Sequence, residues 1–387
     1  MKILFVSLGC DKNLVDSEKM LGMLQEKGYT FTDDEAEADV VVVNTCCFIG
    51  DAKEESINTL LQMGELKDSG QIKALIAAGC LAQRYREEIQ KEIPQVDAII
   101  GTTAIDEIVA ALEEILAGQK QNHYEDINAA PVTETNRVVT TGGHFAYLKI
   151  AEGCDKHCTY CIIPKVRGNY RSVPKESLLK EATELADKGV RELILVAQET
   201  TLYGMDLYGK KELPRLLHEL AQIPGIYWIR ILYCYPEEIT DELIDAIAAE
   251  PKVCNYLDIP IQHASDNVLK RMGRRTDQAE LRAIIGKLRE KIPDTCLRTT
   301  LISGFPGETQ EDFEELYRFV NEMEFDRLGV FPYSQEEDTP AATMEDQVPQ
   351  EVKEFRRDEL MELQQAIAFD KAEDMVCLLY TSPSPRD

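Results

Sequence analysis

The stretch "AYLKIAEGCDKHCTYCIIP", residues 146–164, joins an apolar run typical of a β-strand to a loop with three cysteines. Cys154, Cys158 and Cys161, called the loop triad below, are separated by three residues and then by two, among charged side chains that do not suit a core. A zinc site normally takes a fourth protein ligand, and His157 lies between two of the cysteines. A [4Fe-4S] cluster that binds three cysteines and leaves one iron open fits this spacing better. The loop therefore predicts an iron–sulfur site whose open iron is the place of reaction.

Strands and helices alternate through the chain that follows this loop. From residue 144 onward, short apolar runs typical of strands are separated by amphipathic segments typical of helices. The predicted strands lie at residues 146–153, 191–200, 228–233, 256–263, 296–305 and 327–334. Six such βα units predict an open or partial TIM-type barrel over residues 144–347, with its chemistry at the carboxyl ends of the strands.

The first 118 residues show the same alternation at a shorter period. Their apolar runs are unbroken and rich in β-branched residues, which is typical of a parallel sheet covered by helices on both faces. The predicted strands lie at residues 2–10, 39–46, 73–80 and 96–100. Residues 1–118 are therefore predicted to form an α/β domain of the Rossmann-like or flavodoxin-like type.

Three more cysteines, called the edge triad below, end the first three of these runs. Cys10, Cys46 and Cys80 are far apart in the sequence, but the carboxyl ends of parallel strands share one edge of a sheet. Three equivalent positions favour a second iron–sulfur cluster over the alternative, in which each cysteine is a small buried residue. Cys47 leaves the choice of ligand open by one residue, because neighbouring side chains on a strand point to opposite faces.

The remaining segments carry weaker signals. Residues 119–143 are polar, lack a helical or strand period, and are predicted to be a linker. Residues 348–375 are predicted to form one charged helix. Residues 376–387 are rich in Ser and Pro and continue no pattern, so they are predicted to be a non-native tail, and Cys377 is given no role.

The composition restricts the classes of function. With 42 basic and 70 acidic residues, the net charge is −28, which favours a basic partner over a nucleic acid. No apolar run approaches the roughly 20 residues that span a membrane, and the first residues do not resemble a signal peptide, so we expect a cytoplasmic protein. Thiols stay reduced in that compartment, so the 11 cysteines are not expected to form disulfides.

Several motifs together resemble those of a known enzyme family. They are "SLGCDKNLVDSE", "VVVNTC", "AAGC", "AEGCDKHCTYCIIP" and "IQHASDNVLKRMGR". This set is similar to the radical S-adenosylmethionine (SAM) methylthiotransferases, and the form "CDKN" is similar to their RimO type, which acts on a ribosomal protein. The related tRNA-modifying MiaB type usually has Gln-Met in place of Asp11 and Lys12. The resemblance extends from residue 1 to about residue 375.

The resemblance implies two [4Fe-4S] clusters with different roles. The cluster on the loop triad would bind SAM through its open iron and cleave it to a 5′-deoxyadenosyl radical. The cluster on the edge triad would carry the sulfur that is transferred, after methylation by another SAM. The implied substrate is the β-carbon of an aspartate in protein twelve of the small ribosomal subunit. A reducing electron donor and a source of sulfur are further implied partners.

Four other residues are candidates for contacts with SAM. Tyr160, inside the loop triad, is predicted to lie against the adenine. Gln198 and Glu199, at the end of the second barrel strand, are predicted to bind the methionine amino group. Gly304, in "LISGFPGET", is predicted to let the backbone approach the adenosine. The alternative is that these positions are solvated polar residues and a turn glycine.

Two other functions compete with this interpretation. A MiaB-like tRNA adenosine methylthiotransferase is disfavoured by the acidic charge, because a tRNA binder should present a broad basic surface. A non-catalytic iron–sulfur protein is disfavoured because electron carriers usually bind each cluster through four thiolates. Members of the resembled family normally close with a small β-barrel, the TRAM domain, which docks the substrate. We expect that barrel to be absent, because the sequence stops where it should begin.

Overall fold

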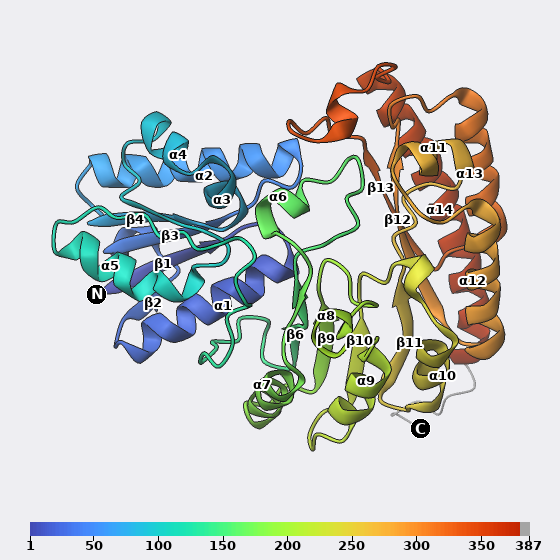
Figure 1. Ribbon diagram of the computed structural model, residues 1–387, viewed down its shortest axis with the longest axis horizontal. Coiled ribbons are helices and arrows are strands. Elements are labelled where there is room, and N and C mark those ends of the chain that lie inside the picture. The colour runs from blue at the N-terminus through green and yellow to red at the C-terminus, as the bar shows by residue number, and fades with distance from the viewer. Residues whose placement is uncertain (380–387) are drawn as a thin grey trace. The chain divides into compact units, whose positions relative to one another are not determined.

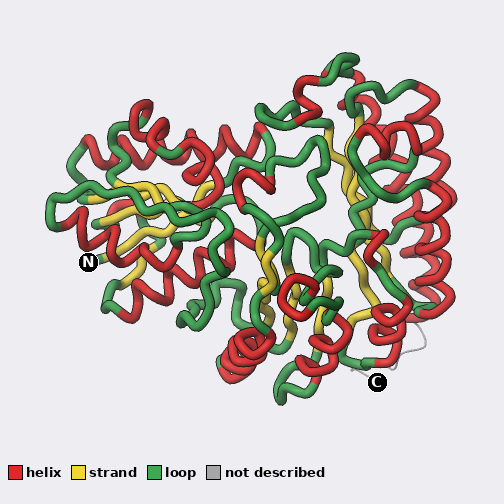
Figure 2. The backbone as a smooth tube through the Cα atoms, viewed as in Figure 1, coloured by secondary structure: helices red, strands yellow, loops and turns green. Residues whose placement is uncertain are grey.

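The computed structural model describes residues 1–379 and forms an α/β protein with parallel sheets (Figures 1 and 2). The described chain divides into two compact units. The first unit holds residues 1–157 and 161–229, and the second holds residues 158–160 and the chain from residue 230 onward. Most of the tail that the sequence predicts to be non-native, from residue 380, lies outside the described residues.

The N-terminal part of the first unit contains a parallel sheet with the strand order β2-β1-β3-β4-β5. Its strands are β1 (Lys2–Ser7), β2 (Thr30–Thr32), β3 (Val40–Thr45), β4 (Ala74–Ala78) and β5 (Ala98–Ile100). This order is the flavodoxin-like one, which confirms the predicted fold type. The short edge strand β2 is not in the prediction, because its three residues, none of them buried, leave too short a pattern to recognise.

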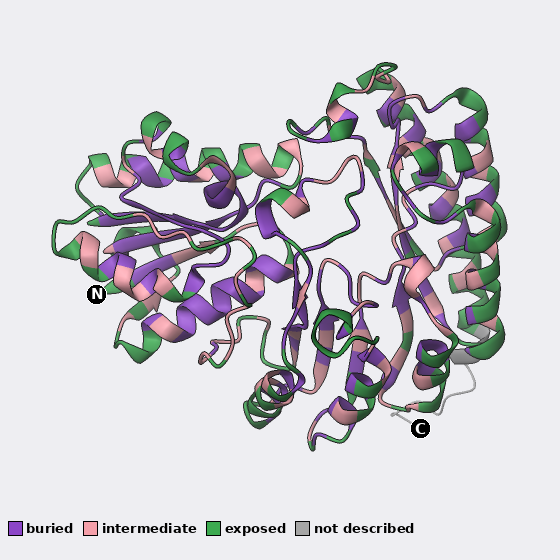
Figure 3. Cartoon of the chain, in the orientation of Figure 1, coloured by how far each residue is buried: buried purple, intermediate pink, exposed green. Residues whose placement is uncertain are grey.

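Helices cover both faces of this sheet. They are α1 (Asp11–Glu26), α2 (Gly50–Asp68), α3 (Gly79–Tyr85), α4 (Glu87–Glu92) and α5 (Ile108–Leu116), with one-turn helices η1 (Glu35–Glu37) and η2 (Ile105–Glu107). Figure 1 shows α2, α3 and α4 over one face and α1 and α5 over the other. Each face buries its own apolar cluster, and the strands β3, β4 and β5 between them are buried throughout (Figure 3). Burial on both faces explains why the apolar runs of β3 and β4 are unbroken.

A second parallel sheet has the strand order β13-β12-β11-β10-β9-β6. Its strands are β6 (Phe145–Lys149), β9 (Glu192–Val196), β10 (Trp228–Ile231), β11 (Val253–Asp258), β12 (Cys296–Ser303) and β13 (Arg327–Pro332). Two short strands, β7 (Ala151–Glu152) and β8 (Arg171–Ser172), form a separate antiparallel pair. The strands follow one another in sequence order across the sheet, as expected for a partial βα barrel.

Helices alternate with the strands of this sheet. They are α6 (Ile163–Arg167), α7 (Lys175–Asp187), α8 (Met205–Tyr208), α9 (Leu213–Ala221), α10 (Asp241–Ala249), α11 (Asp266–Arg271), α12 (Gln278–Lys291), α13 (Gln310–Met323) and α14 (Gln350–Leu379), with η3 (Pro236–Glu238) and η4 (Pro340–Thr343). Capping boxes begin α12, at Asp277 and Glu280, and α13, at Thr309 and Asp312. These reciprocal hydrogen bonds satisfy backbone N–H groups that would otherwise lack partners, and they fix where the two helices start.

Two further segments complete the chain. Residues 119–143 contain no helix or strand, although an isolated parallel bridge joins His123 to Ile100 of β5. The helix α14 continues to Leu379, beyond the end at residue 375 that the sequence suggested. No helix within the described residues is both long enough and apolar enough to cross a membrane.

Candidate functional site: two cysteine triads

The edge triad follows three strands that are paired in register. Ser7 pairs with Asn44, and Asn44 pairs with Ala78, at the carboxyl ends of β1, β3 and β4. The three cysteines come three, two and two residues after these positions. The strand order reverses at β1, and flavodoxin-like folds bind their ligands at this switch point.

The loop between β1 and α1 lies directly on the second cysteine of this triad. Gly9, just before Cys10, has a φ of +87°, which side chains rarely adopt. A Cβ atom added to Gly9 would lie 2.7 Å from Cβ of Cys46 and 2.9 Å from its Sγ. Glycine at this position therefore lets the loop that carries Cys10 pack directly against Cys46.

Asn13, in the first turn of α1, ties the loops of the edge triad together. It is fully buried, and its Nδ2 donates to the backbone oxygens of Leu8 and Thr45, both at 3.0 Å. Its Oδ1 accepts from Sγ of Cys80 at 3.7 Å. One side chain thus links the ends of β1, β3 and β4, which gives the asparagine of "CDKN" a structural reason.

Arg167, the last residue of α6, adds a buried cation to this edge. Its side chain is 2 % exposed, and its Nε donates to Sγ of Cys80 at 3.3 Å. Its Nη1 contacts the carboxylates of Asp16 at 2.7 Å and Glu152 at 3.2 Å. Lys149 pairs with the same two carboxylates. The two cations and two anions balance one another, as buried charges require.

Two thiols of the edge triad, those of Cys46 and Cys80, have raised pKa values. Burial raises the pKa of Cys80 well above its usual value, Arg167 opposes this, and the nearby thiols of Cys47, Cys46 and Cys10 add to the rise. Burial also raises the pKa of Cys46. Cys46 and Cys80 therefore hold their protons at neutral pH, and a metal centre would displace those protons on binding.

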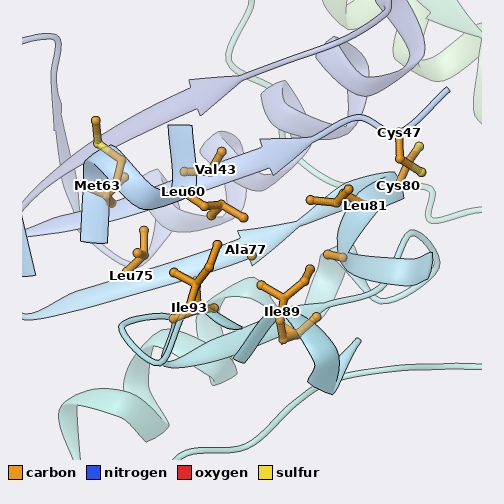
Figure 4. Close-up of a cluster of buried hydrophobic side chains, with 14 of the residues drawn as sticks. Val43, Cys47, Leu60, Met63, Leu75, Ala77, Cys80, Leu81, Ile89 and Ile93 are labelled. Carbon is orange, nitrogen blue, oxygen red and sulfur yellow. The ribbon is translucent and has the colours of Figure 1, made fainter. Parts of the chain in front are cut away.

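Cys46 is better placed than Cys47 to serve in the edge triad. Cys47 is 0 % exposed and belongs to the apolar cluster beneath α2 and α3, which Figure 4 shows. Cys46 is 6 % exposed and lies against the loop at Gly9. Cys80, on the first turn of α3, belongs to the same cluster as Cys47 but is 7 % exposed. The donor set of Cys10, Cys46 and Cys80 suits a soft metal centre such as an iron–sulfur cluster.

The loop triad follows the short strand β7. Cys154 and Cys158 are buried, and Cys161 is half-buried. The backbone N of Cys154 donates to the oxygen of Gly168 at 3.1 Å, which holds the start of the loop. In the second unit, Sγ of Cys158 lies 3.7 Å from the hydroxyl of Tyr235. Among the described residues, no three His, Cys, Asp or Glu side chains are grouped so as to hold a metal ion.

Two of the predicted SAM contacts lie after β9 in the first unit. Gln198 donates from Nε2 to Glu152 at 3.0 Å. Glu199 is fully buried, its Oε1 accepts from the backbone N of Thr201 at 3.0 Å, and its Oε2 lies 4.0 Å from Nζ of Lys156. Glu199 is therefore not the solvated polar residue of the alternative interpretation. Its role toward SAM stays a prediction.

The other two predicted SAM contacts lie in the second unit. The ring of Tyr160 packs edge-on against Phe305, with centroids 6.4 Å apart. Gly304 has a φ of +68°, and its backbone N donates to Glu308 at 2.8 Å. A Cβ at Gly304 would collide with Lys353 of α14. Helix packing alone thus accounts for glycine here, and its contact with adenosine stays a prediction.

The buried network around Arg167 is absent from the sequence-based prediction. Arg167 lies 151 positions from Asp16 and 87 from Cys80. The only available signal is that charged residues flank the loop triad on both sides, at Glu152 and in "PKVRG". Such residues are usually solvated, so no local pattern indicates that they pair with one another.

Comparison with known proteins defines the class first. Residues 148–320 match the Radical SAM superfamily, and residues 2–101 match "Uncharacterized protein family UPF0004". A solved radical SAM methyltransferase, TsrM from Kitasatospora setae with cobalamin and a [4Fe-4S] cluster bound, has a similar fold. The TM-score is 0.62 at 13 % identity, over 88 % of this chain and 76 % of that one. Membership of the radical SAM superfamily implies that this chain uses SAM and a [4Fe-4S] cluster.

Curated relatives then define the family. The chain is 64 % identical over 376 residues to the ribosomal protein uS12 methylthiotransferase RimO of Lachnoclostridium phytofermentans, which covers 97 % of this chain and 86 % of that protein. It is 50 % identical to the protein of the same name from Clostridium tetani, over 97 % of this chain and 84 % of that one. This chain belongs to the family of ribosomal protein uS12 methylthiotransferases.

Proposed function

We infer that this chain is a radical SAM methylthiotransferase that adds a methylthio group to ribosomal protein uS12. The observation that carries this inference is the 64 % identity to a uS12 methylthiotransferase over 97 % of the chain. The register of the edge triad at the flavodoxin-like switch point supports it independently, because a radical SAM barrel alone would not need those cysteines.

We further propose two [4Fe-4S] clusters, one on each triad. When bound, the loop-triad cluster with SAM supplies an oxidising carbon radical, and the edge-triad cluster supplies sulfur for transfer. Cys154, Cys158 and Cys161 would hold the first of these. Cys10, Cys46 and Cys80 would hold the second, with Gly9 and Asn13 fixing their loops.

Other residues of the chain would bind and orient SAM. We propose that Gln198 and Glu199 hold the methionine amino group, since Glu199 provides a buried carboxylate after β9. We propose that Tyr160 lies against the adenine and that the backbone at Gly304 faces the adenosine. The burial of Glu199 would exclude water from that part of the site, which protects a reactive radical from side reactions.

The charge of the chain favours a basic protein substrate. A net charge of −28 attracts a basic ribosomal protein over long range and repels the phosphates of tRNA. The modified atom is proposed to be the β-carbon of an aspartate in uS12. A reducing electron donor and a sulfur source complete the reaction, and we propose that it takes place in the cytoplasm, where ribosomes are modified.

A competition between substrates tests this function. The anaerobically reconstituted chain is given SAM, a reductant and equal concentrations of uS12 and unmodified tRNA, and both are analysed by mass spectrometry. We expect uS12 to gain one methylthio group in place of one hydrogen, at a rate that falls as salt rises. Preferential modification of tRNA at matched salt would place the chain in the other branch of the methylthiotransferases.

A further inference from the structure

Arg167 presents each part of its guanidinium group to a different partner. Nη1 faces two carboxylates, Nη2 donates to Oδ1 of Asn13, and Nε donates to Sγ of Cys80. A guanidinium group has five N–H donors in a fixed planar fork. With its other donors held by Asp16, Glu152 and Asn13, the direction of Nε–H toward the sulfur is set by the surrounding chain.

The charges around Arg167 are balanced, so its Nε–H can still donate to Sγ of Cys80 when that sulfur ligates a cluster. Asp16 and Glu152 are neutralised by Arg167 and Lys149, and all four side chains are buried. An N–H donor aimed at a cysteine sulfur that ligates a cluster stabilises the reduced form, because reduction adds negative charge. Removing the donor should therefore make reduction harder.

Resting on the proposed edge-triad cluster, we propose that Arg167 is a positioning residue that donates a hydrogen bond to the ligand sulfur of Cys80 and raises the reduction potential of that cluster. Arg167 also joins two sites through its contacts. Glu152, which holds Nη1 of Arg167, accepts from Gln198 on its other oxygen at 3.0 Å. A continuous run of hydrogen bonds thus connects Cys80 to a predicted SAM contact within the first unit.

The chain provides a matched control for this proposal. Arg137 is buried to a similar extent and contacts two carboxylates, with Nε donating to Glu18 at 2.7 Å and Nη1 donating to Glu181 at 2.9 Å. Its remaining hydrogen bond goes to the backbone oxygen of Tyr147, at 2.6 Å, and not to a cysteine. A lysine at either position keeps the charge but loses the planar fork.

The experiment uses the full chain with the loop triad replaced by alanine, so that only the edge-triad cluster is loaded. Into this parent we introduce Arg167→Lys or Arg137→Lys, and the midpoint potential of each reconstituted protein is measured by redox titration followed by electron paramagnetic resonance. We expect Arg167→Lys to shift the potential to more negative values and Arg137→Lys to leave it at the parent value. Equal potentials in both variants would overturn the role of Arg167.

A second measurement applies where Arg167→Lys does not fold or load. The parent is prepared with isotopically labelled arginine guanidinium nitrogens, and the reduced cluster is examined by electron–nuclear double resonance. A hyperfine coupling from a guanidinium nitrogen supports the contact with Cys80, and its absence overturns it. A parent that binds no cluster at all would instead overturn the edge-triad cluster itself, and with it this proposal.

Discussion

Replacing Gly9 by alanine should destabilise the protein more than backbone strain alone would, and it should also disrupt the edge triad. The alanine Cβ would lie 2.7 Å from Cβ of Cys46 and 2.9 Å from its Sγ, closer than non-bonded carbon and sulfur atoms approach. Gly28 provides the control, because it has the same φ of +87° and an added Cβ there meets nothing within 4 Å. The two variants share the conformational cost and differ in the collision.

The two contributions can be given rough sizes. An L-residue in the left-handed region costs about 1–2 kcal/mol, so Gly28→Ala should lower the free energy of unfolding by about that amount. Overpacking in a well-packed site typically costs a further ~1–3 kcal/mol, so Gly9→Ala should lower it by ~2–5 kcal/mol. The collision also pushes Cys46 away from Cys10, so the edge triad should no longer gather its ligands.

The assay combines denaturant unfolding of the metal-free proteins with iron and sulfide analysis after reconstitution. Gly9→Ala should retain about four iron atoms per chain, those of the loop triad, while Gly28→Ala should retain about eight. If Gly9→Ala matched Gly28→Ala in both unfolding and iron content, the proposed convergence of Cys10 on Cys46 would be wrong.

Three further predictions concern the number of clusters, the choice between Cys46 and Cys47, and the charge of Glu181. The reconstituted wild-type chain should bind about eight iron and about eight sulfide per chain, and a well-folded sample with about four of each would rule out a second cluster. Cys46→Ala should lose half of that iron while Cys47→Ala should keep it, since Cys46 lies against the loop before Cys10 and Cys47 is fully buried; the reverse result would exchange their roles. Burial raises the pKa of Glu181, but Lys19 and Arg137 outweigh it and hold the pKa below the usual 4.5. The stability that Glu181 contributes is therefore complete above about pH 4.5 and lost as pH falls through its folded-state pKa. The difference in unfolding midpoint between wild type and Glu181→Gln should narrow from pH 7 to pH 3, and a constant difference would contradict this.

Much of the fold could be predicted because its signals are local. Unbroken β-branched runs such as residues 40–43 indicate strands buried on both faces, and the alternation with amphipathic segments indicates parallel sheets. The candidate ligands could be predicted for a related reason. Each cysteine of the edge triad comes just after an apolar run, and parallel topology then places them at one edge.

What the sequence did not predict depends on contacts between distant residues. Nothing near Arg167 indicates that it contacts Cys80, 87 positions away, or that the neighbouring Glu152 balances its charge. The choice between Cys46 and Cys47 likewise depends on which of the two lies against the loop between β1 and α1, at Gly9. The strand β2 was missed because a three-residue edge strand gains its stability from pairing with β1 and not from its own pattern.

Removing each triad in a separate variant tests most directly the central claim that the two triads have different roles. One variant carries alanine at Cys154, Cys158 and Cys161, and the other carries alanine at Cys10, Cys46 and Cys80. Each is reconstituted, mixed with SAM, reductant and uS12, and analysed by mass spectrometry for 5′-deoxyadenosine and for modified uS12. The account predicts that the first variant forms neither product and that the second forms 5′-deoxyadenosine but no methylthiolated uS12. Methylthiolated uS12 from the second variant would contradict the proposed role of the edge triad.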